Sequence, residues 1–260
     1  MLVSHLMPTT IRESSYRKKF LENREENLFM GSFESFAGAE AGAPPSKAVG
    51  YDNAPAEAFY SHQVAFYDYP GLFWLGRSLD DGMRSIFDLG GHIGIKYYAF
   101  RRMLNYPVDL HWTVCDVPTV VKAGREFAAK REATSQLDFT TDFRDASGYD
   151  LLYASGSLQY LPQRISEIIA ALPVKPRRIV LNTTAVHPER TLYTLNSIGF
   201  AVCPYRIQHH DQLLAELAAA GYKRRDAWRN EGKLIEVPFV EGGDKLTTPV
   251  AALIWRSAFC

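Results

Sequence analysis

The sequence has no surplus of charge of either sign. Its 260 residues include 29 Lys and Arg and 29 Asp and Glu, so the formal net charge is zero at pH 7. Nucleic-acid and membrane-surface partners favour a basic protein face, so this balance argues against both. Residues 223–233 hold five basic side chains, but Asp226 and Glu231 dilute them, which is more typical of a solvated strand end.

Cysteine is scarce, and long apolar runs are missing. Cys115, Cys203 and Cys260 are odd in number and lack metal-ligand spacing, so we expect a reduced, cytoplasmic chain with neither a disulfide framework nor a metal site. No apolar run reaches about 18 residues, which predicts that no helix spans a membrane. The basic residues near the N-terminus precede charged sequence, so we also expect no signal peptide.

Several motifs of known chemistry are missing as well. The dinucleotide fingerprint G-x-G-x-x-G fails, because from Gly90 its second and third glycines would fall on His92 and Ile95. The chain has no phosphate-loop lysine pattern, no G-x-S-x-G turn and no Ser/His/Asp order. These absences weigh against a nicotinamide-dependent oxidoreductase and against a hydrolase.

A regular alternation of strands and helices begins at residue 84. It predicts strands over 84–89, 110–115, 137–141, 150–154, 178–181, 222–228 and 250–256, and helices over 93–104, 117–131, 163–172 and 211–220. Such an alternation indicates an α/β fold with a doubly wound, mostly parallel sheet. No helix separates the last two strands, so we expect them to form an antiparallel hairpin at one edge.

The preceding residues, 1–83, are expected to form a helical extension or cap, and residues 84–260 the main domain. Residues 11–30 could form a helix, and residues 37–50 are rich in Ala, Gly and Pro, as in a linker. Residues 54–80 are rich in aromatic side chains, with Pro70-Gly71 expected to separate two helices. These rings could pack in a core or line a substrate pocket.

A glycine-rich turn follows the first predicted strand of the main domain. The strand ends at an acid, Asp88, and Gly90, Gly91 and Gly94 then lead into a helix. Glycine lets the backbone approach a ligand closely, and the first turn of a helix presents unpaired N–H groups. The turn therefore predicts a site for a nucleotide-type cofactor.

More polar residues follow the next strands, at the edge where parallel sheets bind ligands. Asp116 could accept both hydroxyls of a ribose, Val117 could cover a purine, and Asp142 could accept from an adenine amino group. Ser155 lies in a small-residue stretch after the fourth strand. The alternative for each acid is a role in ending a strand or capping a helix.

From about residue 84 onward, the sequence resembles the class I S-adenosylmethionine-dependent methyltransferases. The resemblance rests on residues 87–94 (Phe-Asp-Leu-Gly-Gly-His-Ile-Gly), 115–121 (Cys-Asp-Val-Pro-Thr-Val-Val) and 150–161, and on the ending around 213–222. More narrowly, it is similar to uncharacterised bacterial methyltransferase-like proteins associated with surface-polysaccharide gene sets. The Asp-Val-Pro element also resembles that of plant-type O-methyltransferases.

The resemblance implies a Rossmann-like fold, S-adenosylmethionine as the cofactor, and a role for each matching residue. Asp88, Gly90, Gly91 and Gly94 would line its methionine and ribose part. Asp116 would take the ribose hydroxyls and Asp142 the adenine edge, with Ser155 on the methionine side. The chain departs from the family at His92, where the usual turn has a glycine, so that side chain must point away from the cofactor or partly fill its site.

Residues that hold the methyl acceptor should come from the loops after the fourth and fifth strands and from the N-terminal cap. His187 is the preferred general base, since imidazole titrates near neutrality, and Tyr160 is a second catalytic candidate; the alternative for His187 is a surface loop histidine. His209-His210-Asp211 could suggest a metal site, but the sequence offers no third ligand, and Asp211 could instead cap a helix.

The leading hypothesis is a cytoplasmic enzyme that moves a methyl group to a hydroxyl of a small molecule or sugar. The sugar follows only from the family resemblance. Two alternatives stay open: a degenerate methyltransferase fold that serves as a non-catalytic binding protein, which His92 favours, and a nicotinamide-dependent oxidoreductase, which the failed fingerprint weakens.

Overall fold

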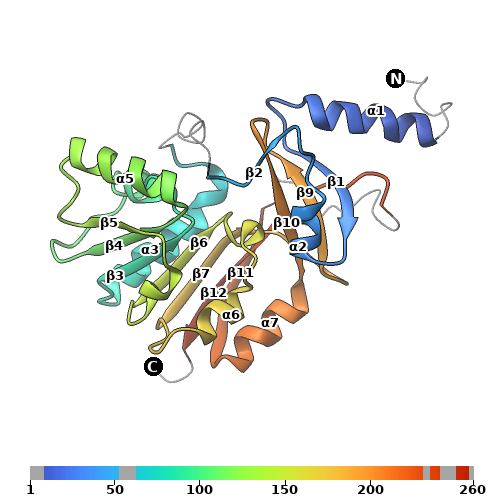
Figure 1. Ribbon diagram of the computed structural model, residues 1–260. Coiled ribbons are helices and arrows are strands. Elements are labelled where there is room, and N and C mark those ends of the chain that lie inside the picture. The colour runs from blue at the N-terminus through green and yellow to red at the C-terminus, as the bar shows by residue number, and fades with distance from the viewer. Residues whose placement is uncertain (1–8, 53–62, 231–234, 241–249, 258–260) are drawn as a thin grey trace.

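The computed structural model describes residues 9–52, 63–230, 235–240 and 250–257, which form two sheets with helices around them (Figure 1). The larger sheet has seven strands in the order β11-β12-β7-β6-β3-β4-β5. Strands β7, β6, β3, β4 and β5 run parallel, and β12 is antiparallel to both of its neighbours, β7 and β11. The strands are β3 (Ser85–Leu89), β4 (His111–Cys115), β5 (Leu137–Thr140), β6 (Leu151–Ser155), β7 (Arg178–Thr184), β11 (Tyr222–Asn230) and β12 (Val250–Ser257). The predicted mostly parallel α/β sheet and its antiparallel C-terminal hairpin are confirmed.

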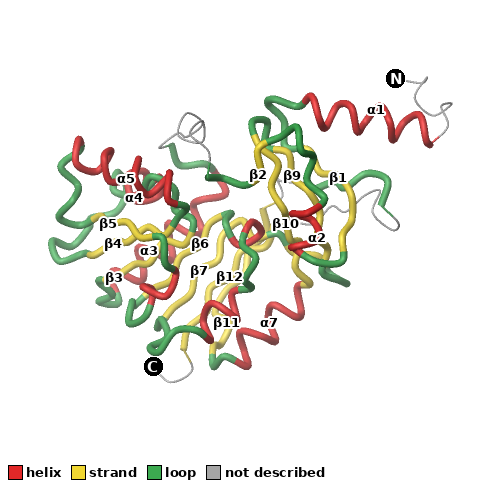
Figure 2. The backbone as a smooth tube through the Cα atoms, viewed as in Figure 1, coloured by secondary structure: helices red, strands yellow, loops and turns green. Residues whose placement is uncertain are grey.

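Helices cover both faces of this sheet (Figure 2) because successive strand residues point to opposite sides. In β3, Ile86 packs with α3 (Tyr69–Asp80), α4 (Ile95–Phe100) and α5 (Pro118–Lys130). The next residue, Phe87, packs with α6 (Ile165–Ala170) and α7 (His210–Ala219). The sheet is thus doubly wound, with an apolar core on each face.

Strand order reverses at β3, which lies between β4 and β6. The chain leaves β3 for β4 and β5 on one side and then returns to β6 on the other. In open parallel sheets, ligands bind beyond the carboxyl ends of the strands at such a point. The glycine-rich turn directly follows β3, so the fold puts it at the reversal.

A second sheet combines residues from two distant parts of the chain. Its order is β1-β9-β10-β2, with β8 pairing β10 beside that path. Strand β1 pairs antiparallel with β9, and β9 with β10, whereas β2 and β8 pair parallel with β10. The strands are β1 (Leu28–Phe33), β2 (Ala48–Val49), β8 (Val186–His187), β9 (Leu192–Ser197) and β10 (Ala201–His209). The sheet therefore joins the N-terminal segment to the insert between β7 and α7.

The N-terminal segment differs from the expected helical extension. Helix α1 (Thr9–Glu22) ends before the predicted 11–30 helix does, because the Asn23 side chain accepts the N–H of Glu26 at 3.0 Å and turns the chain into β1. Phe29 then packs on Tyr205 of β10, with ring centroids 5.0 Å apart. The expected linker at 37–50 includes most of α2 (Phe36–Ala41) and all of β2.

In the aromatic stretch, Pro70 does not separate two helices. It occupies the first turn of α3, where its missing N–H costs no helical hydrogen bond, and a short 3-10 turn, η3 (Phe66–Asp68), precedes it. Residues 53–62, including His62, lie outside the described part of the chain. Within the described part, no helix is both long and apolar enough to cross a membrane.

Candidate functional site

The glycine turn is held close to its neighbours, and two of its glycines have no room for a side chain. Gly90, at φ +75°, donates its N–H to Cys115 O at 2.7 Å, and a Cβ on it would lie 2.2 Å from the Cβ of Ser157. A Cβ on Gly91 would lie 2.4 Å from the Asp88 carboxyl carbon. Gly94, at φ +85°, is the N-cap of α4. These glycines therefore let the turn pack tightly against β4, Asp88 and the loop after β6.

Asp88 is buried at the end of β3. Its Oδ2 accepts the indole N–H of Trp112 at 3.2 Å. Burial raises the pKa of Asp88 to about 7, although the Trp112 bond and the nearby Lys96 act in the opposite direction. Lys96 itself pairs with the buried Asp68 at 2.7 Å. The turn therefore lies beside a carboxyl group whose ionisation is opposed by burial.

Asp116 joins the second predicted motif to the glycine turn. Its Oδ2 accepts the backbone N–H of His92 at 2.8 Å, and its Oδ1 accepts that of Val117 at 2.8 Å. Burial raises the pKa of Asp116 to about 6, against the effect of these two bonds. Val117 is half-buried and is the N-cap residue of α5. Asp88, Gly90, Gly91, Gly94, Asp116 and Val117 thus lie together at the reversal point of the sheet.

His92 adopts the left-handed conformation that a glycine would favour, with φ +56°, and its side chain is buried. Burial lowers its pKa to about 4, so the ring is neutral at pH 7. The fold therefore buries the His92 side chain, while the His92 backbone retains the left-handed conformation that glycine favours.

Asp142 and Ser155 have local partners. The Asp142 carboxylate accepts the N–H of Arg144 at 2.9 Å and pairs with its guanidinium at 3.3 Å, as in the capping alternative. Ser155 accepts the side-chain amide of Asn182 at 3.1 Å, and that amide's oxygen accepts the Trp228 indole N–H at 3.3 Å. Ser155 thus belongs to a polar group on the α3 side of β6 and β7.

The two catalytic candidates lie on the side of the second sheet. His187, in β8, is buried, and its Nδ1 accepts the backbone N–H groups of Glu189 at 3.0 Å and Arg190 at 3.1 Å. In the neutral ring its proton is therefore on Nε2. The Tyr160 hydroxyl donates to Asn196 Oδ1 of β9 at 2.8 Å. Both polar groups are used to hold turns and strands together.

His209, His210 and Asp211 do not form a metal centre. His209 Nε2 lies 3.1 Å from Pro188 O, and His210 Nδ1 lies 2.8 Å from Asp211 Oδ1. Across the described residues, no three His, Cys, Asp or Glu side chains are grouped so as to hold a metal ion.

Comparisons with known proteins bear on the fold. No protein-family model matches the sequence, and no curated protein matches it. Among solved structures, OxaC in complex with S-adenosylhomocysteine and oxaline superposes with a TM-score of 0.51 at 14% identity, over 78% of this chain and 49% of that one. This chain thus spans about half the length of OxaC.

Two further structures have lower scores. The Burkholderia thailandensis 1,6-didemethyltoxoflavin-N1-methyltransferase, with 1,6-didemethyltoxoflavin and S-adenosylhomocysteine bound, gives a TM-score of 0.48 at 15% identity, over 74% of this chain and 78% of that one. Magnesium protoporphyrin IX methyltransferase from Synechocystis PCC 6803, with S-adenosylmethionine bound, also gives 0.48 at 15% identity, over 80% of this chain and 94% of that one.

The strand order and the likeness to OxaC agree. The chain has the Rossmann-like methyltransferase fold. In this methyltransferase fold, β1, β2 and β8–β10 form a second sheet beside the larger one (Figure 1).

Two further residues border the candidate site, Ser157 in the small-residue stretch expected after the fourth strand and Asp52, which was not predicted. Asp52, just after β2, accepts the N–H of Thr119 at 3.0 Å and so caps α5 three residues beyond Asp116. Ser157 donates to Leu89 O directly before the glycine turn. No sequence signal points to Asp52, because it lies in a segment with no motif.

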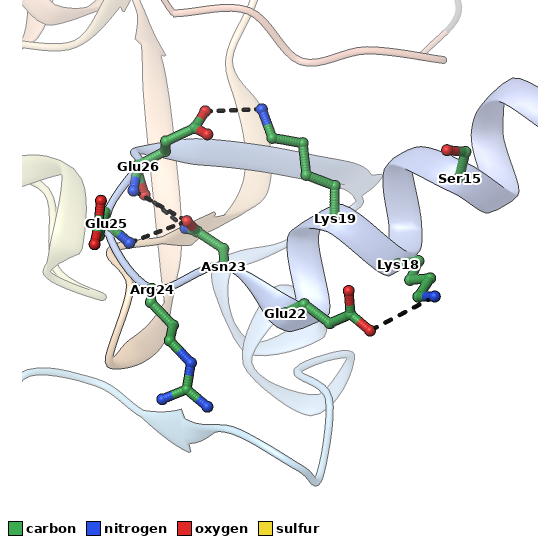
Figure 3. Close-up of a pocket in the computed structure, with 8 residues that line it drawn as sticks. All are labelled: Ser15, Lys18, Lys19, Glu22, Asn23, Arg24, Glu25 and Glu26. Atoms are coloured by element: carbon green, nitrogen blue, oxygen red, sulfur yellow. Dashed lines mark hydrogen bonds and ion pairs between the residues drawn. The ribbon is translucent and has the colours of Figure 1, made fainter.

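A hollow of about 500 Å³ lies elsewhere on the molecule, at the turn from α1 to β1 (Figure 3). It is lined by Ser15, Lys18, Lys19, Glu22, Asn23, Arg24, Glu25 and Glu26. Three of these side chains are basic and three are acidic, and Lys19 pairs with Glu26 at 2.8 Å. The hollow therefore offers no net charge to a ligand, and it is separate from the glycine turn.

Proposed function

We propose that this protein is an S-adenosylmethionine-dependent methyltransferase that methylates a hydroxyl of a small molecule or sugar in the cytoplasm. The observation that carries the proposal is the Asp116 carboxylate, held 2.8 Å from the His92 backbone N–H of the glycine turn. An acid and a close-approach turn at the reversal point of a parallel sheet suit a nucleoside. OxaC, which superposes on this chain with a TM-score of 0.51, was crystallised with S-adenosylhomocysteine.

The residues fit such a cofactor chemically. Each oxygen of Asp116 accepts one backbone N–H and has lone-pair capacity left for a ribose hydroxyl. Val117 is half-buried and could cover the adenine, with Asp142 at its amino edge. Asp88, Gly90, Gly91, Gly94 and Ser155 would border the methionine part.

The bound cofactor would supply a methyl group on a cationic sulfonium. What the protein contributes is placement of the acceptor in line with that methyl, exclusion of water, and removal of the acceptor's proton. We retain His187 as the candidate general base. To act through Nδ1 it would have to release the N–H groups of Glu189 and Arg190, which it accepts in this structure. Tyr160 would likewise have to leave Asn196.

The second candidate function is a non-catalytic binding protein with the same fold. It is favoured by His92, whose buried side chain stands where the family's turn has a glycine. It is also favoured by the local partners of His187 and Tyr160.

Melting temperatures measured with added ligands test the proposal. A ligand that binds only the native state raises the melting temperature in proportion to the logarithm of its concentration. We expect S-adenosylhomocysteine to raise it and NADH to leave it unchanged. A rise with NADH alone would instead favour an oxidoreductase, and no rise with either would favour the binding-protein alternative.

A further inference from the structure

Strand β10 of the second sheet carries a buried cation that binds the loop after β6. Arg206 is 2% exposed. Its guanidinium donates to three backbone carbonyls, Leu158 O at 3.1 Å, Pro162 O at 3.0 Å and Gln163 O at 2.9 Å. All three carbonyls belong to the 156–163 loop, which connects β6 to α6 and contains the 3-10 turn η5 (Leu158–Tyr160).

The charge of Arg206 is balanced by backbone carbonyls rather than by an ion pair with a carboxylate. Glu167 and Glu216 lie near enough to raise the pKa of Arg206, but both pair with Arg164, and none of the salt bridges among the described residues includes Arg206. Burial outweighs their effect and lowers the pKa of Arg206. Burying a cation without a counter-ion is costly unless its N–H groups are used in hydrogen bonds. The planar fork of arginine spreads its N–H donors over three nitrogens and can reach carbonyls in different directions, whereas lysine has all three of its N–H donors on one nitrogen. Arg206 is therefore suited to fixing the shape of this loop.

The loop fills a gap along the edge of β10. Strand β2 pairs with β10 at Ala201–Val202, and β8 pairs with it at Gln208–His209. Between these two pairings, η5 packs against β10, and the Tyr160 ring meets the Tyr205 ring edge-on at 4.9 Å. The loop thus packs against β10 between its pairings with β2 and β8.

The other end of the same loop touches the glycine turn. Ser157 donates to Leu89 O, and its Cβ lies 2.2 Å from where a Cβ on Gly90 would be. Gln159 is buried and donates to Gly156 O at 2.9 Å and to Thr183 O at 3.3 Å, which joins the loop to the end of β7. A continuous set of contacts therefore runs from Arg206 through the loop and Ser157 to Gly90.

We propose that Arg206 is a positioning residue, through which the second sheet sets the position of Ser157 and thereby the conformation of the glycine turn. In the enzyme proposed above, the inserted sheet then governs cofactor affinity without touching the cofactor. The effect on cofactor affinity depends on the proposed function. The effect of Arg206 on the conformation of the glycine turn does not.

Hydrogen exchange on the ligand-free full-length protein tests the link. In Arg206→Lys, which retains the charge but replaces the guanidinium fork with a single ammonium nitrogen, we expect the Gly90 and Gly94 amides to exchange about tenfold faster than in wild type. Arg178→Lys is the matched control, because Arg178 is also buried but bonds Ser78 and Asp81, beside the start of β7. It should leave both glycine amides unchanged. Faster exchange confined to the 156–163 loop would contradict the proposal.

A double-mutant cycle on S-adenosylhomocysteine affinity adds a readout that a loss of stability alone would not produce. Arg206→Lys and Ser157→Ala should each weaken binding about three- to tenfold, and together by less than the product of the two effects, because they interrupt one set of contacts. Independent effects would overturn the role of Ser157. If the wild type binds no S-adenosylhomocysteine, the proposed function fails, and the exchange rates still decide the positioning role.

Discussion

Buried polar groups differ between two regions, the second sheet and the carboxyl ends of the strands in the larger sheet. At these strand ends, Asp88 and Asp116 are enclosed so that burial raises their pKa values to about 7 and about 6. In the second sheet, Arg206 and Asn196 are buried, but neutral partners satisfy them. The strand ends therefore hold negative charge at a cost, as a site for a cationic or hydroxyl-bearing ligand would. The second sheet instead uses its buried polar groups to hold neighbouring segments such as the 156–163 loop.

The largest expected effect concerns the charge of Asp88. Its folded pKa of about 7 exceeds the unfolded value of 3.8, so the folded state binds more protons between these values. Stability is therefore highest below about pH 4 for this group and is lost as pH rises towards 7, by up to about 4 kcal/mol. Asp88→Asn should remove this loss, so its advantage in melting temperature over wild type should grow between pH 5 and 8.

Asp150 provides a control of opposite sign. Burial alone would raise its pKa, but hydrogen bonds from the N–H groups of Arg84 and Ser85 lower it overall. Asp150 thus contributes stability above pH 4 that is lost as pH falls. Asp150→Asn should be less stable than wild type at pH 7. A constant difference between Asp88→Asn and wild type across pH 5 to 8 would show that Asp88 does not titrate as described.

The second prediction separates Asp116 from Asp142. Asp116→Ala should weaken S-adenosylhomocysteine binding about tenfold or more, because a charge-assisted hydrogen bond contributes roughly 1.5–3 kcal/mol. Asp142 is less enclosed and already pairs with Arg144, so Asp142→Ala should change affinity about twofold at most. Titration calorimetry on both variants and the wild type measures the contrast, and an Asp116→Ala affinity equal to that of wild type would remove Asp116 from the site.

A smaller effect is expected at His187. His187→Ala removes the acceptor for the N–H groups of Glu189 and Arg190 and should lower stability by about 1–2 kcal/mol. His187→Asn, whose side-chain oxygen can replace Nδ1, should recover most of that loss in a denaturant titration. Once an acceptor is known, methyl transfer by His187→Asn at the wild-type rate would exclude His187 as the base.

The smallest effect is expected at Tyr160. Tyr160→Phe leaves Asn196 Oδ1 without the hydroxyl that it accepts at 2.8 Å, which should cost about 1 kcal/mol. Tyr67→Phe, at an exposed tyrosine, should change stability by less than about 0.5 kcal/mol. Equal melting temperatures for the two variants would mean that the second sheet does not depend on this bond.

The same two regions differ in how far the sequence predicts them. Local signals predict the glycine turn, Asp116 and the strands of the larger sheet. Strands β3, β4 and β6 each end at a recognisable turn, and a helix leads from each to the next strand. In the second sheet, Leu28 lies opposite Ser197, so the pairing depends on residues far apart in the sequence. Its buried side chains also include Thr194 and Asn196. Because these residues are polar, β9 lacks the alternation of apolar and polar residues by which a strand is predicted from sequence.

The candidate site residues differ in the same way. Asp88, Gly90 and Asp116 could be proposed from the sequence because each lies at or just after the end of a strand. Asp52 and Arg206 act on segments that are distant in sequence, so no spacing points to them.

We infer that the glycine turn and Asp116 bind S-adenosylmethionine despite His92. Titration calorimetry of the wild-type protein with S-adenosylhomocysteine is the decisive experiment. We expect saturable binding with one ligand per chain, weakened in Asp116→Ala. Absence of binding at high protein concentration would rule out a cofactor site at this turn.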